Sequence, residues 1–261
     1  MKTQVYVEFD GTGVPMVATE VAGRKGKQPD GTAKTREAKL GCVFTQTGLD
    51  EAGRPVRDRN SASFVGAIET ADAFGARFYD EAVRRGLYRA QRVVTLSDGA
   101  EWAKNLADTQ FPNAIHIIDF YHAAEHVARF AKKFYERTPQ LLDAQIDRWT
   151  EDLYEGRVQA IIDHASALLP KDPDARRDAR KEIAYLHKNK DRMKYDEYCA
   201  QGLFIGSGVI EAACKHVIGQ RLKQSGMFWS LRGANAIIAL RCAILSNRFE
   251  EFWEHRHAKA A

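Results

Sequence analysis

The spacing of hydrophobic and polar residues changes several times along the chain. Extended apolar runs lie on both sides of Asp10-Gly11 in QVYVEFDGTGVPMVATEV (4–21), a pattern typical of a β-hairpin that turns at Asp-Gly. AKLGCVFTQTG (38–48) predicts a third strand, and residues 61–90 carry apolar side chains at helical spacing. The N-terminal third therefore predicts three antiparallel strands followed by helix.

Two strand–helix units follow this segment. RVVTLSDGAEWAKNLADTQFP (92–112) and NAIHIIDFYHAAEHVARFAKKFYERT (113–138) each begin with a short apolar run and continue with a helical period. Successive units of this kind imply parallel strands joined by helical crossovers. From about residue 120 to 200 only charged helical patterns remain, interrupted at proline residues.

Three antiparallel strands followed by two parallel ones predict an α/β fold with a ribonuclease H-like mixed sheet, although other mixed α/β sheets share this element order. We divide the chain into a first part of the core (1–120), an all-helical insertion (121–201) and the last helices of the core (202–261). The helical insertion is therefore expected directly before the helix that carries the last candidate catalytic residue.

Composition and charge narrow the class of protein. With 44% hydrophobic and 28% charged residues, the chain is typical of soluble globular proteins, and no apolar run is long enough to cross a membrane. The four cysteines are scattered without a C-x-x-C pair, which favours reduced thiols in a cytoplasm and argues against a zinc finger. Residues 201–249 contain six basic residues and one acid, which suits either a phosphate-rich partner or a solvated helix face.

Three acidic residues lie at the ends of predicted strands or helices. Asp10 ends the first strand, Asp98 ends the fourth, and Glu211 lies early in the helix after GSG (206–208). Each has a structural explanation, since Asp-Gly fits a tight turn, Asp98-Gly-Ala-Glu101 matches a capping box, and acids favour helix N-termini. If the fold brings them together, their repulsion favours bound cations, and oxygen ligands suit Mg²⁺ or Mn²⁺ ions that promote in-line phosphoryl transfer.

The stretch DFYHAAEH (119–126) raises an alternative. It contains His122-Ala-Ala-Glu125-His126, the H-x-x-E-H arrangement of one class of zinc peptidases. On a helix the two histidines share a face and can hold one Zn²⁺. A peptidase needs a third ligand that the sequence does not identify, and it leaves the strand-end aspartates unexplained. A zinc peptidase is therefore the remote alternative.

Several motifs resemble those of bacterial insertion-sequence DDE transposases of the ISKra type, which are related to the Mutator-like group. GLFIGSGVIEAACKHVIGQRLKQSGMFWS (202–230) resembles the block around their catalytic glutamate. VEFDGTGVPM (7–16) resembles their first-aspartate motif, and LSDGAEW (96–102) resembles the second. IIDFYHAAEH (117–126) resembles the Asp-x-x-His segment of Mutator-like enzymes, and the resemblance runs in order from about residue 5 to 248.

This resemblance implies a catalytic and metal-binding triad of Asp10, Asp98 and Glu211 that holds Mg²⁺ or Mn²⁺, as two ions. Asp119 and His122 become accessory residues near the site, and the H-x-x-E-H match becomes a coincidence. The implied activity is cleavage and transfer of DNA strands at transposon ends and target DNA. The enzyme is expected to work as a homo-oligomer in the bacterial cytoplasm, at the nucleoid.

Residues after Glu211 are candidates for contact with DNA. Lys215 follows Glu211 by one helical turn, and Arg221 and Lys223 lie further along. Phosphate contact is the functional interpretation of these three, and surface ion pairs are the structural one. Phe228 and Trp229 have the chemistry to stack on an unpaired base, but aromatic residues at this spacing are expected in the core.

The resemblance departs from the family at the N-terminus. The first catalytic motif begins within ten residues of Met1, so the region with which such transposases recognise transposon ends is expected to be missing. The chain is then expected to be a truncated or internally initiated remnant, a domesticated derivative, or a partner to a separately encoded recognition subunit. The alternative to an active catalytic core is a truncated or domesticated DNA-binding remnant without productive transposition.

Overall fold

The computed structural model has a mixed five-stranded sheet with the strand order β5-β2-β1-β6-β7. β1, β2 and β5 are antiparallel neighbours, whereas β1, β6 and β7 are parallel. The strands span β1 Gln4–Pro15, β2 Thr35–Gln46, β5 Ser63–Ala67, β6 Arg92–Ser97 and β7 Ile115–Ile118. Their order across the sheet is third, second, first, fourth, fifth, which confirms the predicted ribonuclease H-like α/β fold.

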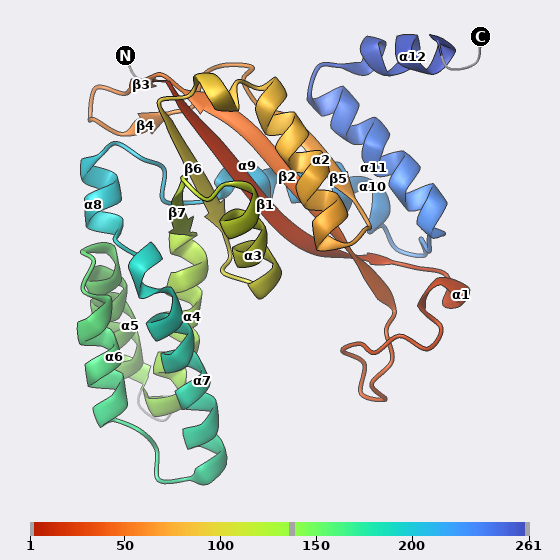
Figure 1. Ribbon diagram of the computed structural model, residues 1–261. Helices are drawn as coiled ribbons and strands as arrows, with labels where there is room; N and C mark the ends of the chain where they lie inside the picture. The colour runs from red at the N-terminus through yellow and green to blue at the C-terminus, as the bar shows by residue number, and fades with distance from the viewer. Residues whose placement is uncertain (1–2, 136–138, 259–261) are drawn as a thin grey trace.

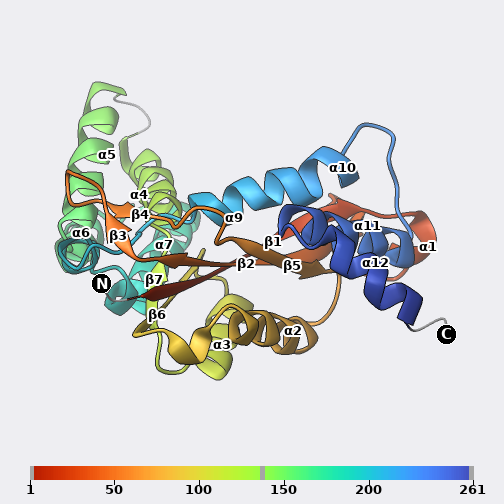
Figure 2. The same cartoon turned by 90° about the horizontal axis from the view of Figure 1, so that it is seen from above.

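Helices cover both faces of this sheet (Figure 2). One face carries α2 (Ala71–Arg84) and α3 (Glu101–Gln110). The other carries α9, the π-helical segment η3, α10 and α11, which form the C-terminal part of the core before α12. Their bounds are α9 Gly208–Ala213, η3 Cys214–Gly219, α10 Gln220–Leu222, α11 Leu231–Leu245 and α12 Phe249–Ala258.

The side chains of β1 alternate between two hydrophobic cores. Val5, Val7 and Phe9 pack in the core beneath α2 and α3. Tyr6 belongs to the other core, which includes residues of α9, η3 and α11. Because neighbouring side chains of a strand point to opposite faces, even-numbered residues of β1 face the helices that follow residue 207.

A block of helices projects beyond the β7 side of the sheet (Figure 1). In the part of the chain that the structure describes, all the regular elements between β7 and residue 201 are helices. The α4 helix leads into the block directly from β7, and α8 leads back toward α9. The bounds are α4 Phe120–Tyr135, α5 Pro139–Tyr154, α6 Val158–Ala167, α7 Pro173–Asn189, η2 Lys190–Arg192 and α8 Tyr195–Ala200.

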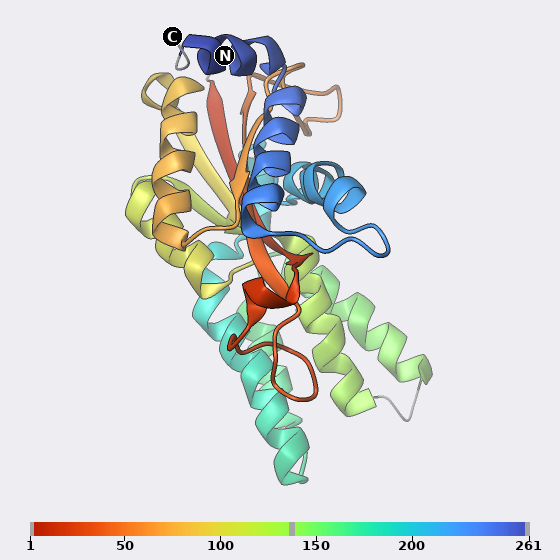
Figure 3. The ribbon, with the colours of Figure 1, turned by 90° about the vertical axis from the view of Figure 1, so that its right-hand side faces the viewer.

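The predicted hairpin turn at Asp10-Gly11 is wrong. β1 continues through both residues and pairs with β2 from Gln4↔Gln46 to Pro15↔Thr35. A type I′ turn requires positive φ at both central residues, and neither Asp10 nor Gly11 has one. The chain instead turns through the loop of residues 16–34, which contains α1 (Ala18–Val21) and projects beyond the ends of both strands (Figures 1 and 3).

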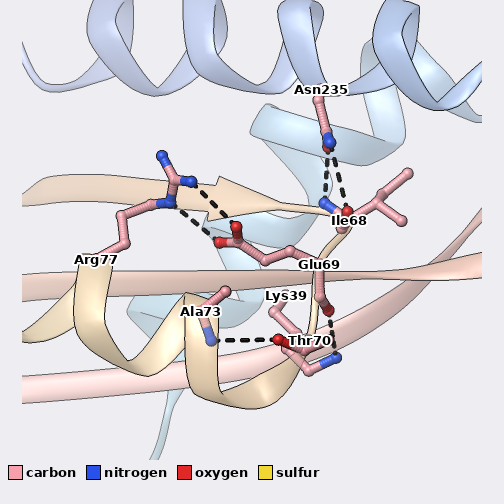
Figure 4. Close-up of polar contacts among 7 residues, drawn as sticks. All are labelled: Lys39, Ile68, Glu69, Thr70, Ala73, Arg77 and Asn235. Carbon is pink, nitrogen blue, oxygen red and sulfur yellow. Dashed lines mark hydrogen bonds and ion pairs between the residues drawn. The ribbon is translucent and has the colours of Figure 1, made fainter.

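The third antiparallel strand is β5, which lies in a segment that helical spacing had predicted as helix. The segment 38–48 forms most of β2 instead. Beyond β5, the side chain of Asn235 in α11 accepts a hydrogen bond of 2.7 Å from the backbone N–H of Ile68. Figure 4 shows the turn that follows, in which Thr70 accepts a hydrogen bond from Ala73 and caps α2. Tertiary pairing therefore overrides the local helical pattern at β5.

The smaller elements complete the described structure. β3 (Gly48–Leu49) pairs with β4 (Pro55–Val56), and the 3₁₀ turn η1 (Leu87–Arg89) follows α2. The structure describes residues 3–135 and 139–258, so small portions of all three predicted parts of the chain (1–2, 136–138 and 259–261) lie outside it. Among the described helices, none is both long and apolar enough to cross a membrane.

Candidate functional site

Three aspartates end up in one row across the parallel strands. β1 pairs with β6 up to Glu8↔Leu96, and β6 pairs with β7 up to Ser97↔Ile118. Continuing both registers past the last pairs places Asp10 level with Asp98, and Asp98 level with Asp119. β6 and β7 end beside Asp98 and Asp119, whereas β1 runs on past Asp10, so neighbouring strands bring together acids that are distant in the sequence.

Asp10 lies half-buried on the face of β1 that packs against η3. Its Oδ1 accepts a hydrogen bond of 2.6 Å from the backbone N–H of Gly11, and its Oδ2 lies 3.6 Å from the donor Cys214 Sγ. Burial raises the pKa of Asp10, and the Asp98 carboxylate raises it further against the lowering effects of Gly11, Cys214 and His122. The register and the electrostatics therefore agree that Asp10 and Asp98 face a common space.

Asp98 shapes the turn between β6 and α3. Its Oδ1 accepts a hydrogen bond of 2.9 Å from the backbone N–H of Ala100. The predicted capping box does not form, because Ala100 is the N-cap residue of α3 and the carboxylate of Glu101 pairs with Lys188 of α7. The hydroxyl of Tyr185, also in α7, donates to the backbone oxygen of Asp98 at 3.1 Å. The helical block thus supports the turn that carries Asp98.

Glu211 lies on α9 but its carboxylate is turned toward solvent. The side chain is 66% exposed, and its Oε1 accepts a hydrogen bond of 2.9 Å from Lys215 Nζ, one turn further along. In residues 3–135 and 139–258, no group of three or more His, Cys, Asp or Glu side chains is arranged to hold a metal ion. The structure therefore brings Asp10 and Asp98 together and leaves Glu211 in an ion pair at the edge of the site.

Two buried carboxylates hold the start of α9 against the sheet. Glu8 Oε2 accepts a hydrogen bond of 2.9 Å from the backbone N–H of Ile210. Asp119 Oδ2 accepts one from the backbone N–H of Ser207, and its Oδ1 accepts one of 2.6 Å from the N–H of His122. Acceptors at a helix N-terminus satisfy otherwise unpaired N–H groups and interact favourably with the helix dipole. Asp119 therefore fixes the beginnings of both α4 and α9.

Glu8 is a residue of the site that sequence reasoning missed. It is fully buried, and burial raises its pKa to about 8 despite the hydrogen bond from Ile210. Asp119 raises this pKa further through charge repulsion. The sequence does carry a signal, because Glu8 is an acid on an inward-facing position of the apolar strand VYVEF.

The loop before α9 depends on a close approach. A Cβ atom at Gly206 would lie 2.7 Å from the ring of Tyr121, so a larger residue would require this exposed ring to shift. Ser207 is the N-cap residue of α9, but its side chain makes no capping hydrogen bond, and its N–H is already bound to Asp119. The GSG segment therefore docks on α4 rather than presenting a free serine cap.

The H-x-x-E-H arrangement gains no support from the geometry. His122 and His126 share a face of α4, with ring centroids 5.0 Å apart. Glu125 is exposed and pairs with Arg129 on the same helix. His126 Nδ1 lies 2.7 Å from a carboxylate oxygen of Glu182, and this partly buried pair lies within the helical block. The glutamate that a peptidase would use therefore does not accompany the two histidines.

The basic candidates lie along the surface that continues from Glu211. Lys215, Arg221 and Lys223 are all exposed. Lys223 Nζ donates a hydrogen bond to Thr12 Oγ1, two residues beyond Asp10 on β1. The π-helical turn of η3 separates Glu211 from Lys223, and such turns widen a helix locally and are frequent at functional sites. The positively charged side chain of Lys223 is thereby held near Asp10.

Sheet order and strand directions define a ribonuclease H-like α/β protein, with Asp10 and Asp98 at one level of two neighbouring parallel strands. The chain belongs to the uncharacterised protein family UPF0236, whose sequence profile matches residues 76–254. No curated protein matches the sequence.

Among solved structures, the protein is similar to the Drosophila P element transposase strand transfer complex. The two share 9% identity with a TM-score of 0.31. The match covers 95% of this chain and 66% of the other, so this chain spans just under two thirds of the length of that protein.

Proposed function

We propose that this protein is the catalytic core of a DDE transposase that cleaves DNA and transfers strands by in-line phosphoryl transfer. The observation that carries the proposal is the position of Asp10 and Asp98 at one level of adjacent parallel strands, with a raised pKa at Asp10. The sequence motifs around Asp10, Asp98 and Glu211 resemble those of ISKra-type transposases and support the same assignment. The substrates are transposon ends and target DNA, and the active form is a homo-oligomer in the bacterial cytoplasm, at the nucleoid.

The donor set fits a hard divalent cation. Asp10 and Asp98 offer neighbouring carboxylate oxygens, and a cation between them would relieve the repulsion that helps to raise the pKa of Asp10. Glu211 would complete the set after release from Lys215, and an exposed ion pair of this kind contributes only about 0–1 kcal/mol. Asp10, Asp98 and Glu211 would hold Mg²⁺ or Mn²⁺, as two ions, and the metal would supply activation of the attacking hydroxyl and charge stabilisation of the leaving oxygen.

The remaining residues bind DNA and keep the site in shape. Lys215, Arg221 and Lys223 supply positive charge for the phosphate backbone beside the acids. Glu8 and Asp119 hold the N-terminus of α9, so they determine where Glu211 stands relative to Asp10 and Asp98. His122 stabilises the ionised form of Asp10 and is an accessory residue.

A cleavage assay tests the proposal directly. End-labelled duplex DNA is incubated with the protein and Mg²⁺ or Mn²⁺, alongside the Asp98→Asn variant and a reaction with excess chelator. We expect nicked products that depend on the divalent ion and disappear with Asp98→Asn. The zinc content of the purified protein is measured in parallel. Stoichiometric zinc without divalent-dependent nicking would overturn the proposal and restore the metallopeptidase alternative.

One observation favours a second candidate, a DNA-binding remnant without productive transposition. Glu211 is exposed and paired with Lys215 rather than turned toward Asp10 and Asp98. If this arrangement persists on DNA, the site lacks its third acid. The two candidates differ in turnover, because the remnant binds DNA with similar salt dependence and yields no nicked product at any concentration of Mg²⁺ or Mn²⁺.

A further inference from the structure

A second feature lies at the far end of β1, away from the acidic row. The loop of residues 16–34 and Phe228 line an open cavity of about 800 Å³ on the surface. Phe228 is 63% exposed, contrary to the prediction that it belongs to the core. Apolar wall residues come from both ends of the loop, namely Met16, Val17, Ala18, Val21 and Ala33.

The backbone around Phe228 is firmly anchored. The N–H of Trp229 donates to the backbone oxygen of Pro15 at 3.1 Å, and the N–H of Val17 donates to the oxygen of Trp229 at 3.0 Å. The indole N–H of Trp229 donates to the backbone oxygen of Leu222 at 3.1 Å. The ring of Phe228 therefore stands exposed on a backbone that is tied to the end of β1.

The loop itself is folded back tightly. The N–H of Gly26 donates to the backbone oxygen of Gly31 at 2.9 Å, and the N–H of Ala33 donates to the oxygen of Arg24 at 3.2 Å. A Cβ atom at Gly26 would lie 2.4 Å from the Cα atom of Ala33, so glycine is needed where the two arms meet. The cavity is thus bounded by a defined loop.

The rim of the cavity is positively charged. Arg24, Lys25 and Lys34 line it together with a single acid, Asp30. The carboxylate of Asp30 is engaged by Thr32, which donates from its backbone N–H at 3.0 Å and from its hydroxyl at 2.7 Å. An exposed aromatic ring, apolar walls and an excess of cations form the combination that binds a base together with its phosphates.

We propose that this cavity takes an unstacked base from a single-stranded stretch of DNA that flanks the cleavage point. Phe228 stacks on the base, and Arg24, Lys25 and Lys34 bind the adjoining phosphates. The inference rests on the proposed DNA function and adds a separate subsite to it. The excess of positive charge and the exposed ring of Phe228 are the reasons for assigning a nucleotide to this cavity.

The distance from the acidic row agrees with a flanking position. Met16 lies six residues beyond Asp10 along the chain, which corresponds to about 20 Å of extended strand. This length equals about six steps of 3.4 Å along a duplex strand. Lys223, held on Thr12, lies between the two places and continues the line of positive charge.

The test compares two DNA molecules of equal length without divalent metal, so that no cleavage occurs. One is a full duplex, and the other has a single-stranded extension of about six to eight nucleotides. This length follows from the roughly six nucleotide steps that separate the acidic row from the cavity. Affinities are measured by fluorescence anisotropy at near-physiological salt for wild type, Phe228→Ala, Phe228→Trp and Tyr88→Ala. Tyr88 is the matched control, because it is 75% exposed and belongs to η1, outside the cavity lining.

We expect wild type to prefer the extended DNA about tenfold, equivalent to about 1.4 kcal/mol and within the range for stacking of one base. Phe228→Ala should abolish the preference, whereas Phe228→Trp and Tyr88→Ala should keep it. Replacing Arg24, Lys25 and Lys34 by Gln should reduce the salt dependence of binding to the extended DNA more than to the duplex.

Three results would overturn the subsite. The first is a Phe228→Ala variant that retains the full preference, and the second is a wild type that binds both DNA molecules equally while still cleaving DNA. A dimer in sedimentation experiments that Phe228→Ala dissociates, with the DNA preference intact, would assign the cavity to contact between copies. Failure of wild type to bind either DNA would instead remove the proposed function, and the subsite with it.

Discussion

The carboxylate of Glu8 accepts a hydrogen bond of 2.9 Å from the backbone N–H of Ile210, which joins the first strand to the helix of Glu211 across 202 positions of sequence. Asp119 makes an equivalent contact with the N–H of Ser207, three residues earlier. Since both acceptors are buried, the beginning of α9 is fixed on the sheet, while the side chain of Glu211 is exposed and paired only with Lys215 in the described structure. The site therefore combines an anchored helix start with a solvent-exposed acid.

Replacing Glu8 tests whether this contact positions α9. Glu8→Ala leaves the N–H of Ile210 without its acceptor, and an unpaired buried donor of this kind costs about 1–3 kcal/mol. We expect a loss of that size in the free energy of unfolding and slower DNA cleavage. Glu8→Gln keeps an oxygen acceptor and should retain both properties. Chemical denaturation and the nicking assay measure them, and wild-type stability of Glu8→Ala would contradict the positioning role.

Replacing the paired aspartates by asparagine separates chemistry from folding. Asp10→Asn removes a half-buried charge that faces Asp98 and keeps an oxygen to accept from Gly11. Asp98→Asn keeps the acceptor for Ala100. We expect cleavage to disappear in both variants, while the free energy of unfolding at neutral pH stays within about 1 kcal/mol of wild type or rises. Loss of more than about 2 kcal/mol in either variant would assign that aspartate a structural role instead.

The predictable part of the fold came from patterns that tertiary contacts reinforce. The strand–helix repeat after residue 90 predicted two parallel strands, and parallel strands direct their carboxyl ends to one edge of a sheet. Asp98 directly follows Ser97, the last residue of β6, so the sequence alone was sufficient to place it at that edge. The prediction that Asp10 ends the first strand was wrong, because β1 continues to Pro15, but the register of β1 and β6 still places Asp10 level with Asp98.

The unpredicted part depends on partners that lie far away in the sequence. The local turn signal at Asp10-Gly11 is overridden because β2 pairs with β1 over its full length. The helical spacing around Phe64 is overridden in the same way, because β5 pairs with β2 at the edge of the sheet. No sequence pattern links Glu8 to Ile210, whereas the pair of Glu211 and Lys215 follows from their spacing of one helical turn.

Releasing Glu211 from Lys215 tests whether the third acid is available. Lys215→Gln removes an exposed ion pair, so stability should change by less than about 1 kcal/mol. We expect Mn²⁺ to bind the variant more tightly than wild type in calorimetric titrations without DNA, since Glu211 no longer has a competing cation. Glu211→Gln is the matched control and should weaken Mn²⁺ binding. Equal Mn²⁺ affinity of all three proteins would favour the DNA-binding remnant.

His116 gives the fold a defined pH dependence. It is half-buried in β7, with Nδ1 2.9 Å from Thr95 Oγ1, and burial lowers its pKa. The folded protein therefore binds this proton less readily than the unfolded chain. The stability from neutral His116 is complete above the ordinary histidine pKa of about 6.5 and is lost as pH falls through the lowered value.

A His116→Gln variant should remove this pH dependence. The difference in free energy of unfolding between wild type and variant should be constant from about pH 7 to 8 and should shrink as the pH is lowered below about 6.5. Denaturant titrations at a series of pH values measure it. A difference that grows in acid would mean that the folded state favours protonated His116.

The exposed lysine beside the acidic row should determine how DNA binding responds to salt. Lys223 is held on Thr12, next to Asp10 on β1, and a residue that neutralises one phosphate contributes about 0.9 to the slope of log affinity against log salt concentration. We expect Lys223→Gln and Arg221→Gln each to reduce the slope by about one, equally for transposon-end and random duplexes. Lys181→Gln is the control, because this exposed lysine pairs with Asp178 on α7 in the helical block. An unchanged slope for Lys223→Gln would remove this residue from the DNA surface. Transposon-end DNA that binds about a thousandfold more tightly than random DNA would show that the protein has a recognition surface of its own.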